Sequence, residues 1–153
     1  MATNILQTYS ARDLNLTFSS PLIGSISAAG VDGKGIAQID IRMTQDKTIL
    51  DLGIDGAVVP SYIPGDLAEI EIKMWQTCTL HQQFLALANA IKAAADAGDV
   101  SQVFSGAFLI INIVDGSSHY LTGVAPKKIP DKTYQKQAQQ VSWVFVACSC
   151  VNE

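Results

Sequence analysis

The sequence predicts a mainly β fold, α+β at most: a β-sandwich or barrel with one packed α-helix. Three observations predict this class. Several segments alternate apolar and polar residues with a period of two, which is typical of strands with one buried face. One segment, residues 79–98, carries apolar residues at convincing helical spacing. Strands precede and follow this helix, an order that favours a sheet with a helix packed against it.

Length and composition fit a single domain over residues 1–153, whose core can form without disulfides. Charged residues make up 16% of the chain, well below the ~25% typical of soluble domains. Self-assembly is the simplest way to cover the resulting uncharged surface, although Ser, Thr, Gln and Asn could also serve. The net charge of −4 disfavours sequence-reading contact with nucleic acid, which relies on Lys and Arg against phosphate.

The N-terminal part is predicted to contain two strands before a turn. Residues 9–18 alternate apolar and polar side chains, and a Ser-Ser-Pro break separates them from a short strand over 22–27. Three glycines within residues 28–35 then predict a flexible turn.

Two long strands, residues 36–44 and 67–75, are predicted to form a wall with one apolar and one charged face. Side chains alternate strictly along both segments, so every second residue points the same way. The apolar face consists of Ile39, Ile41, Met43, Ile70, Ile72 and Met74. The opposite side, called the charged face below, consists of Asp40, Arg42, Glu69, Glu71 and Lys73.

A hairpin is predicted between the wall strands. Residues 45–47 reverse the chain, residues 48–54 return as a strand, and Asp55-Gly56 is a tight-turn dipeptide between apolar runs. Residues 57–65 contain two prolines and a glycine, so a loop is predicted there rather than a central strand.

The predicted helix begins at Thr79, where Gln82 three residues later has the spacing of a capping box, and it ends at Gly98. Its apolar stripe is predicted to pack on the sheet, and it consists of Leu80, Phe84, Leu87, Ala88, Ile91 and Ala95.

Three strands are predicted after the helix. Residues 104–114 are almost wholly apolar, which predicts a strand covered on both faces. An Asp-Gly turn leads into a strand over 118–124, and an exposed basic loop follows over 125–132. The last strand is predicted over 139–151.

The sequence offers little for catalysis, so no enzyme and no cofactor is predicted. His81 and His119 lack a visible nucleophile partner and are expected to be exposed polar residues. Glu69 and Glu71 are ~6.7 Å apart by strand rise, within the range of glycosidase carboxylates, but any strand with this pattern gives the same spacing. Lys127 and the lysine after it either contact an acidic partner or are solvated.

The three cysteines are expected to be reduced thiols in a cytosolic compartment, because their number is odd and no secretory leader is visible. Cys148 and Cys150 are two residues apart and would share a strand face as small buried hydrophobes rather than metal ligands. No apolar run reaches the ~20 residues of a membrane helix.

Several short motifs resemble the tail tube protein of contractile-tailed bacteriophages, and the resemblance covers nearly the whole chain. The motifs are Tyr9-Ser10-Ala11-Arg12-Asp13, Asp46-Lys47-Thr48-Ile49, Gly53-Ile54-Asp55-Gly56-Ala57-Val58, and Ile72-Lys73-Met74-Trp75-Gln76-Thr77 with the following Leu80, Leu85 and Asn89.

The resemblance implies a structural protein whose hexameric rings stack into a hollow tube around a shared inner barrel of about 24 strands. The charged face (Asp40, Arg42, Glu69, Glu71 and Lys73) would line a mildly acidic lumen through which phage DNA passes without sequence-specific binding. Asp46, Lys47, Asp55 and Gly56 would contact the next ring, and the N-terminal residues are a second candidate for this contact.

Further partners implied by the resemblance are the tail sheath protein, the tape measure protein, the baseplate hub and the tail terminator. The protein would be located in the virion tail after assembly in the host cytoplasm. Two alternatives remain open: a secretion-system tube protein that forms rings and carries effectors, and a small-ligand-binding β-barrel or hydrolase.

Overall fold

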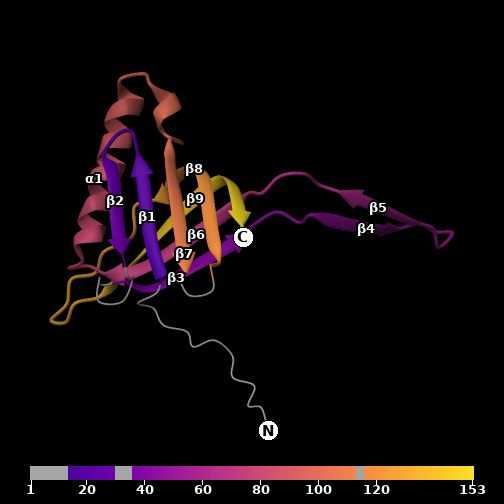
Figure 1. The fold of residues 1–153 in the computed structure, drawn as a ribbon, viewed down its shortest axis with the longest axis horizontal. Helices are drawn as coiled ribbons and strands as arrows, with labels where there is room; N and C mark the ends of the chain where they lie inside the picture. Colours follow the sequence, from indigo (N-terminus) through magenta and orange to yellow (C-terminus); the bar gives the residue numbers. More distant parts are fainter. Residues whose placement is uncertain (1–13, 30–35, 113–115) are drawn as a thin grey trace, which may run out of the picture.

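The computed structural model describes residues 14–29, 36–112 and 116–153 (Figure 1). The elements are β1 (Leu14–Ser20), β2 (Gly24–Ala29), β3 (Ile36–Met43), β4 (Thr48–Leu52), β5 (Val58–Tyr62), β6 (Ala68–Trp75), α1 (Thr79–Asp96), the 3-10 helix η2 (Val100–Gln102), β7 (Gly106–Asn112), β8 (Ser118–Lys128) and β9 (Gln140–Asn152). The start of the strand predicted over 9–18, most of the turn predicted over 28–35 and Asp115 lie outside the described residues.

Seven antiparallel strands form one sheet in the order β2-β1-β7-β8-β9-β6-β3, and β4 and β5 form a separate two-stranded sheet. The larger sheet curls around its own core with α1 alongside it, whereas β4 and β5 project from this body as an arm (Figure 1). The prediction of a mainly β fold with one packed helix is confirmed.

The two predicted wall strands pair directly with each other as β3 and β6. Their register places Ile39 opposite Ile72 and Ile41 opposite Ile70, so these side chains share one face. β6 also pairs with β9 on its other edge and is therefore a central strand, and its residues Ile70, Ile72 and Met74 are fully buried. Met43, near the arm, is 43% exposed, so the apolar face is less covered toward the end of β3.

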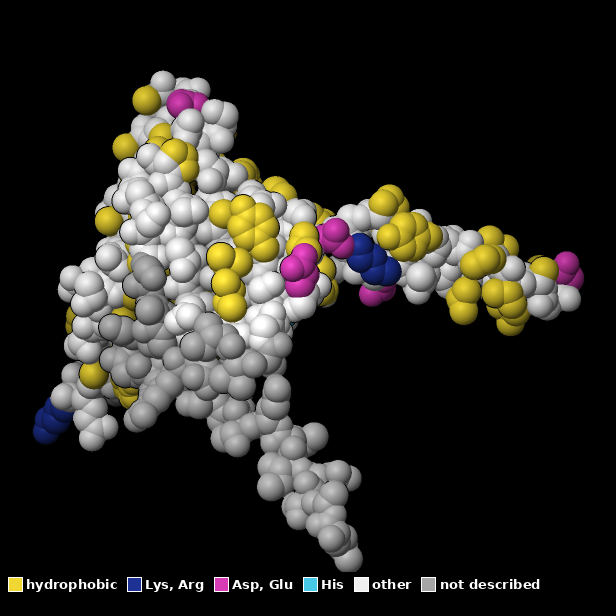
Figure 2. All heavy atoms as spheres, viewed as in Figure 1, with side chains coloured by type: hydrophobic (Ala, Val, Ile, Leu, Met, Phe, Trp, Pro, Cys, Tyr) yellow, Lys and Arg dark blue, Asp and Glu magenta, His cyan; other side chains and the backbone are white. Residues whose placement is uncertain are grey.

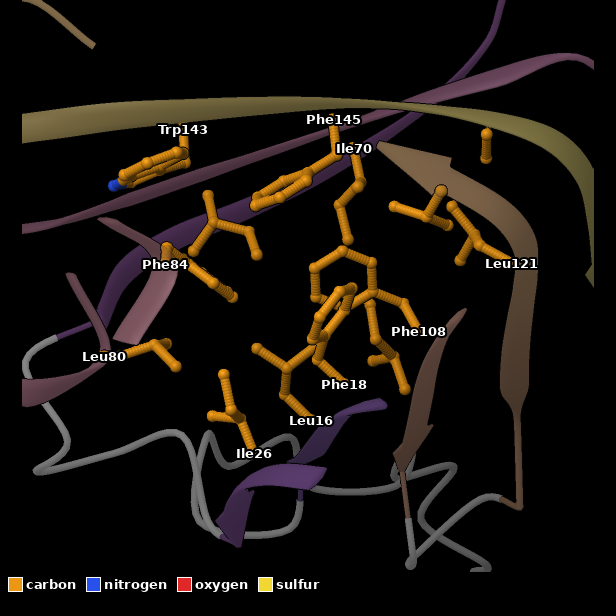
Figure 3. Close-up of a cluster of buried hydrophobic side chains, with 14 of the residues drawn as sticks. Leu16, Phe18, Ile26, Ile70, Leu80, Phe84, Phe108, Leu121, Trp143 and Phe145 are labelled. Carbon is orange, nitrogen blue, oxygen red and sulfur yellow. The ribbon is translucent and has the colours of Figure 1, made fainter. Parts of the chain in front are cut away.

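The core is built around aromatic side chains that α1 and the sheet bring together (Figure 3). Phe84 of α1 lies against Phe145 of β9 with ring centroids 4.9 Å apart, and Phe18 of β1 lies 4.7 Å from Phe108 of β7. Trp143 stacks on Phe145 at 5.8 Å. Aromatic pairs at these separations contribute beyond the burial of their area, so this cluster joins β1, β7 and β9 of the sheet to the helix.

The helix begins without the predicted side-chain cap. Cys78, not Thr79, occupies the N-cap position, and it makes no side-chain capping hydrogen bond. The helix end agrees with the prediction: Gly98 has φ +89°, its N–H donates to Ala95 O, and the Asp99 N–H donates to Ala94 O. This is the Schellman arrangement, which requires a left-handed residue that glycine adopts most easily.

Two segments predicted as loops are strands. Pro60 lies within β5 opposite Leu50, and a two-stranded sheet tolerates it because both of its strands are edges. β8 continues through Pro126 to Lys128, where the pairing with β9 shifts register, as is typical of a proline at a bulge.

The prediction that the two C-terminal cysteines share a buried face is wrong. Cys150 is buried and Cys148 is exposed. In a regular strand, residues three positions apart point to opposite faces. Leu121 and Val124 are three positions apart in β8, as are their partners Cys150 and Ala147 in β9, yet all four side chains are buried. The alternation therefore breaks between them, where Gly123 has φ +64° and a side chain there would collide with Cys148.

The strand β7 was predicted to be covered on both faces. Within the described residues, only one of its faces is fully buried. Phe108 and Ile110 are buried, whereas Leu109 and Ile111 on the other face are half-buried. The apolar run therefore leaves uncharged surface on the outside of the sheet.

His81 was expected to be exposed, and this prediction is wrong: it is 1% exposed in the first turn of α1. The Trp143 Nε1–H donates to His81 Nδ1 at 2.9 Å, which assigns the ring proton of the neutral histidine to Nε2. Burial, and secondarily the charge of Lys132, lowers the pKa of His81 below its ordinary value of 6.5. His81 is thus a neutral part of the core.

Truncation of Phe84 to alanine should lower the free energy of unfolding by about 3–5 kcal/mol, because it leaves a cavity at the centre of the aromatic cluster. Urea unfolding followed by tryptophan fluorescence measures the change. Tyr134→Ala is the control, since Tyr134 is 79% exposed, and its effect should stay within about 0.5 kcal/mol. Equal effects of the two changes would contradict the described core.

Acid should destabilise the protein partly through His81. The unfolded chain binds a proton at His81 below about pH 6.5, whereas the folded chain does so only at a lower pH because the pKa of the buried His81 is lowered. The contribution of neutral His81 to the free energy of unfolding is therefore complete above about pH 6.5, and it is lost as the pH falls toward the pKa of the folded state. The variant His81→Asn keeps an acceptor for the Trp143 N–H but cannot be protonated. Urea titrations at about pH 7.5 and about pH 5.5 should show a smaller loss in the variant. The same loss in both proteins would show that His81 is not held neutral.

Candidate functional site

The charged face lies on the outside of the β3–β6 pair, opposite the core. Asp40 is paired with Glu71 and Arg42 with Glu69 in the strand register, so these side chains alternate with the buried isoleucines. Lys73 stands next to Gln38 in the same register. The predicted grouping on one face therefore holds for all five residues: Asp40, Arg42, Glu69, Glu71 and Lys73.

Salt bridges cross this face, and one of them adds Lys127, which was not predicted to belong to it. Arg42 lies 2.9 Å from Glu71 and 3.9 Å from Glu69, and Lys127 Nζ lies 3.1 Å from the other side of Glu69. The hydrogen bond with Glu71 raises the pKa of Arg42, so its guanidinium stays charged. Lys127 was predicted to lie in a loop, and only the continuation of β8 brings it within reach of β6.

With Lys127 included, the charged face is balanced. Three carboxylates (Asp40, Glu69 and Glu71) stand against three cations (Arg42, Lys73 and Lys127), a net charge of zero for these six groups. Asp40 also accepts two hydrogen bonds from the Gln38 side-chain amide, at 2.8 and 3.0 Å. Half-exposed pairs of this kind contribute little to stability, so their main consequence is the charge pattern that the face presents.

The second feature is the arm, defined as residues 48–62. Every residue of β4 and β5 is exposed, and apolar side chains cover much of its length (Figure 2). Ile54 near the tip is as exposed as in an extended chain, at 111%, and Leu52 is 76% exposed. The exposed large apolar residues of the arm are Ile49, Leu50, Leu52, Ile54, Val58, Val59 and Tyr62.

The base of the arm is fixed to the body. The Lys47 ammonium pairs with the Asp66 carboxylate and also donates to Gly65 O, and the Ile63 N–H donates to Lys47 O at 2.8 Å. The hydrogen bond with Asp66 raises the pKa of Lys47. Two chain segments thus leave the body side by side, which directs the arm outward.

The tip of the arm is a tight turn. Asp55 Oδ1 accepts a hydrogen bond from the Ala57 N–H at 3.0 Å, and Gly56 has φ +85°. The four residues predicted to contact the next ring therefore fall into two separate groups. Asp46 and Lys47 lie at the base, whereas Asp55 and Gly56 lie at the tip.

The described residues show neither a cluster of metal ligands nor a candidate membrane helix. They contain no group of three or more His, Cys, Asp and Glu side chains that could hold a metal ion. No helix within the described ranges has the length and apolarity needed to cross a membrane. His119, the second histidine of the sequence, lies with Nδ1 2.6 Å from Asn152 Oδ1 on the neighbouring strand.

Comparison with solved structures finds the same fold in contractile systems. The tube-terminating cap of the anti-feeding prophage has a TM-score of 0.58 at 10% identity, over 100% of this chain and 95% of that chain. A chain of the sheath/tube terminator of the PVC extracellular contractile injection system in its extended state has a TM-score of 0.55 at 9% identity, over 98% and 99% of the two chains. A chain of the extended PVC sheath-tube complex has a TM-score of 0.52 at 12% identity, over 90% and 87%.

Identities this low establish the fold alone. No curated protein sequence matches the chain. The profile of one family, described as the bacteriophage PhiTE tail tube protein, matches residues 6–152. Because this match spans nearly the entire sequence, the chain belongs to the bacteriophage PhiTE tail tube protein family, whose members are structural proteins and not enzymes.

Proposed function

We propose that the chain is the repeating subunit of a hollow phage tail tube, in which hexameric rings stack to form a conduit for DNA during genome ejection. The observation that carries this proposal is the exposed apolar arm. Removing a Leu or Ile side chain from water is worth about 1.5–3 kcal/mol, and the arm leaves seven large apolar side chains without cover. An arm that projects from its own body gains this free energy by packing on another chain, and a second copy is the partner that a repeating assembly supplies.

Stacking between rings is the role that we assign to the arm. Its tip, with Asp55 and Gly56, reaches away from the body and meets the adjacent ring, while Asp46 and Lys47 at the base lie where the two rings approach each other. The fixed base supports this role because it limits the directions in which the arm can point, and so lowers the entropy lost on docking.

Ring closure is the role that we assign to the sheet edges. β2 and β3 are the two edge strands of the seven-stranded sheet, and open edges of this kind invite pairing with another chain. With four of the seven strands of each of six copies in the wall of the bore, about 24 strands spaced ~4.8 Å apart and tilted by ~40° close into a barrel ~48 Å across, which side chains narrow to roughly 40 Å. Such a bore admits duplex DNA.

The charged face is proposed to line this bore. The sequence favoured a mildly acidic lining, and the contact between Lys127 and Glu69 changes this to a lining with balanced charge. Two of its three cations, Arg42 and Lys127, are held by carboxylates of the same subunit, so they are poorly placed to retain the DNA phosphates that pass them. Such a lining lets a polyanion slide in either direction.

The tail sheath protein, the tape measure protein, the baseplate hub and the tail terminator are the proposed partners, and the virion tail, assembled in the host cytoplasm, is the proposed location. The matched structures support this assignment because they come from sheath-tube and terminator complexes. They also favour one second candidate, a tube protein of an injection system that carries effectors.

Excision of the arm should leave a folded subunit that does not form tubes. Residues 48–62 are replaced by two glycines, which the hydrogen bond between Ile63 and Lys47 makes possible because it holds the two ends together. We expect a far-UV circular dichroism spectrum typical of a folded protein, with the contribution of β4 and β5 lost. We expect only single rings or monomers in negative-stain micrographs. Tubes of normal length from this variant would refute the stacking role.

Loss of the two glutamates should make the tube retain DNA. Glu69→Gln with Glu71→Gln frees Arg42 and Lys127 and leaves the charged face with a positive balance. Variant tubes should co-sediment with short duplex DNA at low salt and release it at about 0.5 M salt, because phosphate contacts are screened.

The matched control for this experiment is Asp96→Asn with Asp99→Asn, which removes the same charge near the end of α1. Control tubes should retain no more DNA than the unmodified ones. A helical reconstruction that places Glu69 and Glu71 away from any central channel would contradict the proposed lining.

A further inference from the structure

A groove on the body lies between α1 and the end of β8. It has a volume of about 200 Å³. Its walls are mostly apolar, with one lysine on each side, and the lining residues are Ala88, Ile91, Lys92, Val103, Ala125, Pro126, Lys128 and Ile129. No acidic residue lines it. Neither lysine forms an ion pair with any other residue in the described ranges, whereas the adjacent Lys127 is held by Glu69.

The arm has the complementary composition. Its apolar side chains are accompanied by Asp51 in β4 and Asp55 at the tip, and residues 48–62 contain no Lys, Arg or His. Neither carboxylate pairs with a cation among the described residues. Asp55 accepts only the local hydrogen bond that shapes the turn. The arm therefore presents apolar surface with two negative charges, and the groove presents apolar surface with two positive charges.

The two surfaces lie on opposite sides of the molecule. α1, which forms one wall of the groove, stands at the side of the body away from the arm (Figure 1). A donor surface on one side and a fitting acceptor on the other side produce head-to-tail contacts, which continue from copy to copy rather than ending at a dimer.

We propose that the groove between α1 and β8 is the acceptor for the arm of a second copy of this chain, with Lys92 and Lys128 pairing with Asp51 and Asp55 around an apolar centre. This inference rests on the proposed role of the arm in assembly and names its binding site. Complementary charges fix the register of such a contact and disfavour wrong partners. The burial of Ile49 and Val59, exposed apolar side chains on the same face of the arm as Asp51, supplies the affinity.

Another hollow, at the base of the arm, is a weaker acceptor. It is lined by Met43, Gln45, Lys47, Asp66, Cys150, Val151 and Asn152. Its two charged residues, Lys47 and Asp66, already pair with each other. They offer no unpaired charge to the acidic arm, so the groove beside α1 is the better match.

A charge exchange tests the proposal. The arm variant is Asp51→Lys with Asp55→Asn, where asparagine keeps the oxygen that shapes the turn. The groove variant is Lys92→Asp with Lys128→Asp. Each variant alone should raise the critical concentration for tube formation by about tenfold or more, because like charges then face each other. The two variants combined in one chain should recover most of the loss.

Charge-matched controls lie outside both surfaces. Asp131→Lys and Lys136→Asp make the same kinds of change in the exposed segment 131–138 and should leave the critical concentration unchanged. Light scattering against protein concentration measures all variants, and circular dichroism verifies that each one is folded.

A cross-link gives a second measurement that does not depend on altered charge. With Cys148→Ser in the background to remove the exposed thiol, Val59→Cys chains are mixed with Ile129→Cys chains, assembled and oxidised, because Val59 lies opposite Asp51 on the same face of the arm. A disulfide-linked dimer is expected. Val100→Cys replaces Ile129→Cys as the control, because Val100 is a similarly exposed apolar residue outside the groove, and it should give no dimer.

The outcomes separate this inference from the proposed function. Tubes that form normally from the groove variant, with no cross-link at position 129, would overturn the acceptor site and leave the tube role intact. An unmodified chain that never assembles at any concentration would overturn the tube role itself. Loss of assembly in both single variants without recovery in the combination, and without the cross-link, would also count against the acceptor site.

Discussion

The fold depends on burying one face of a curled sheet around a single helix. Phe84 brings α1 into contact with rings from β1, β7 and β9, and this cluster leaves no room for a second layer on the same face. Within the described residues, β4 and β5 of the arm lie outside this core and are exposed along their whole length.

β6 connects the core with the candidate site. Its buried residues, such as Ile70 and Ile72, alternate with Glu69 and Glu71 on the charged face, so a shift of one residue in its register would exchange core and site. Neighbours on both edges, β3 and β9, prevent such a shift. The spacing of the charged side chains is therefore as rigid as the core behind them.

Local patterns in the sequence predicted most of this arrangement. Period-two alternation located β3 and β6 to within one residue, Gly98 marked the end of α1, and the resemblance to tail tube proteins is confirmed by the family match over residues 6–152. Two of the errors concern contacts between distant segments. Burial of His81 depends on Trp143, 62 residues later, and the place of Lys127 on the charged face depends on how far β8 continues beside β9.

The ion pairs of the charged face bear on how a tube could carry DNA without binding it. A free lysine or arginine on a bore gains affinity for phosphate by releasing condensed counterions. Arg42 and Lys127 already have carboxylates within 4 Å, so contact with a phosphate would first require separation from Glu71 or Glu69. The net gain from each phosphate contact is then small, although the number of cations is unchanged. Ion pairs between cations and carboxylates on the same face of the sheet thus reduce the binding of DNA to the bore. They do so without the long-range repulsion that a purely acidic bore would impose on entering DNA.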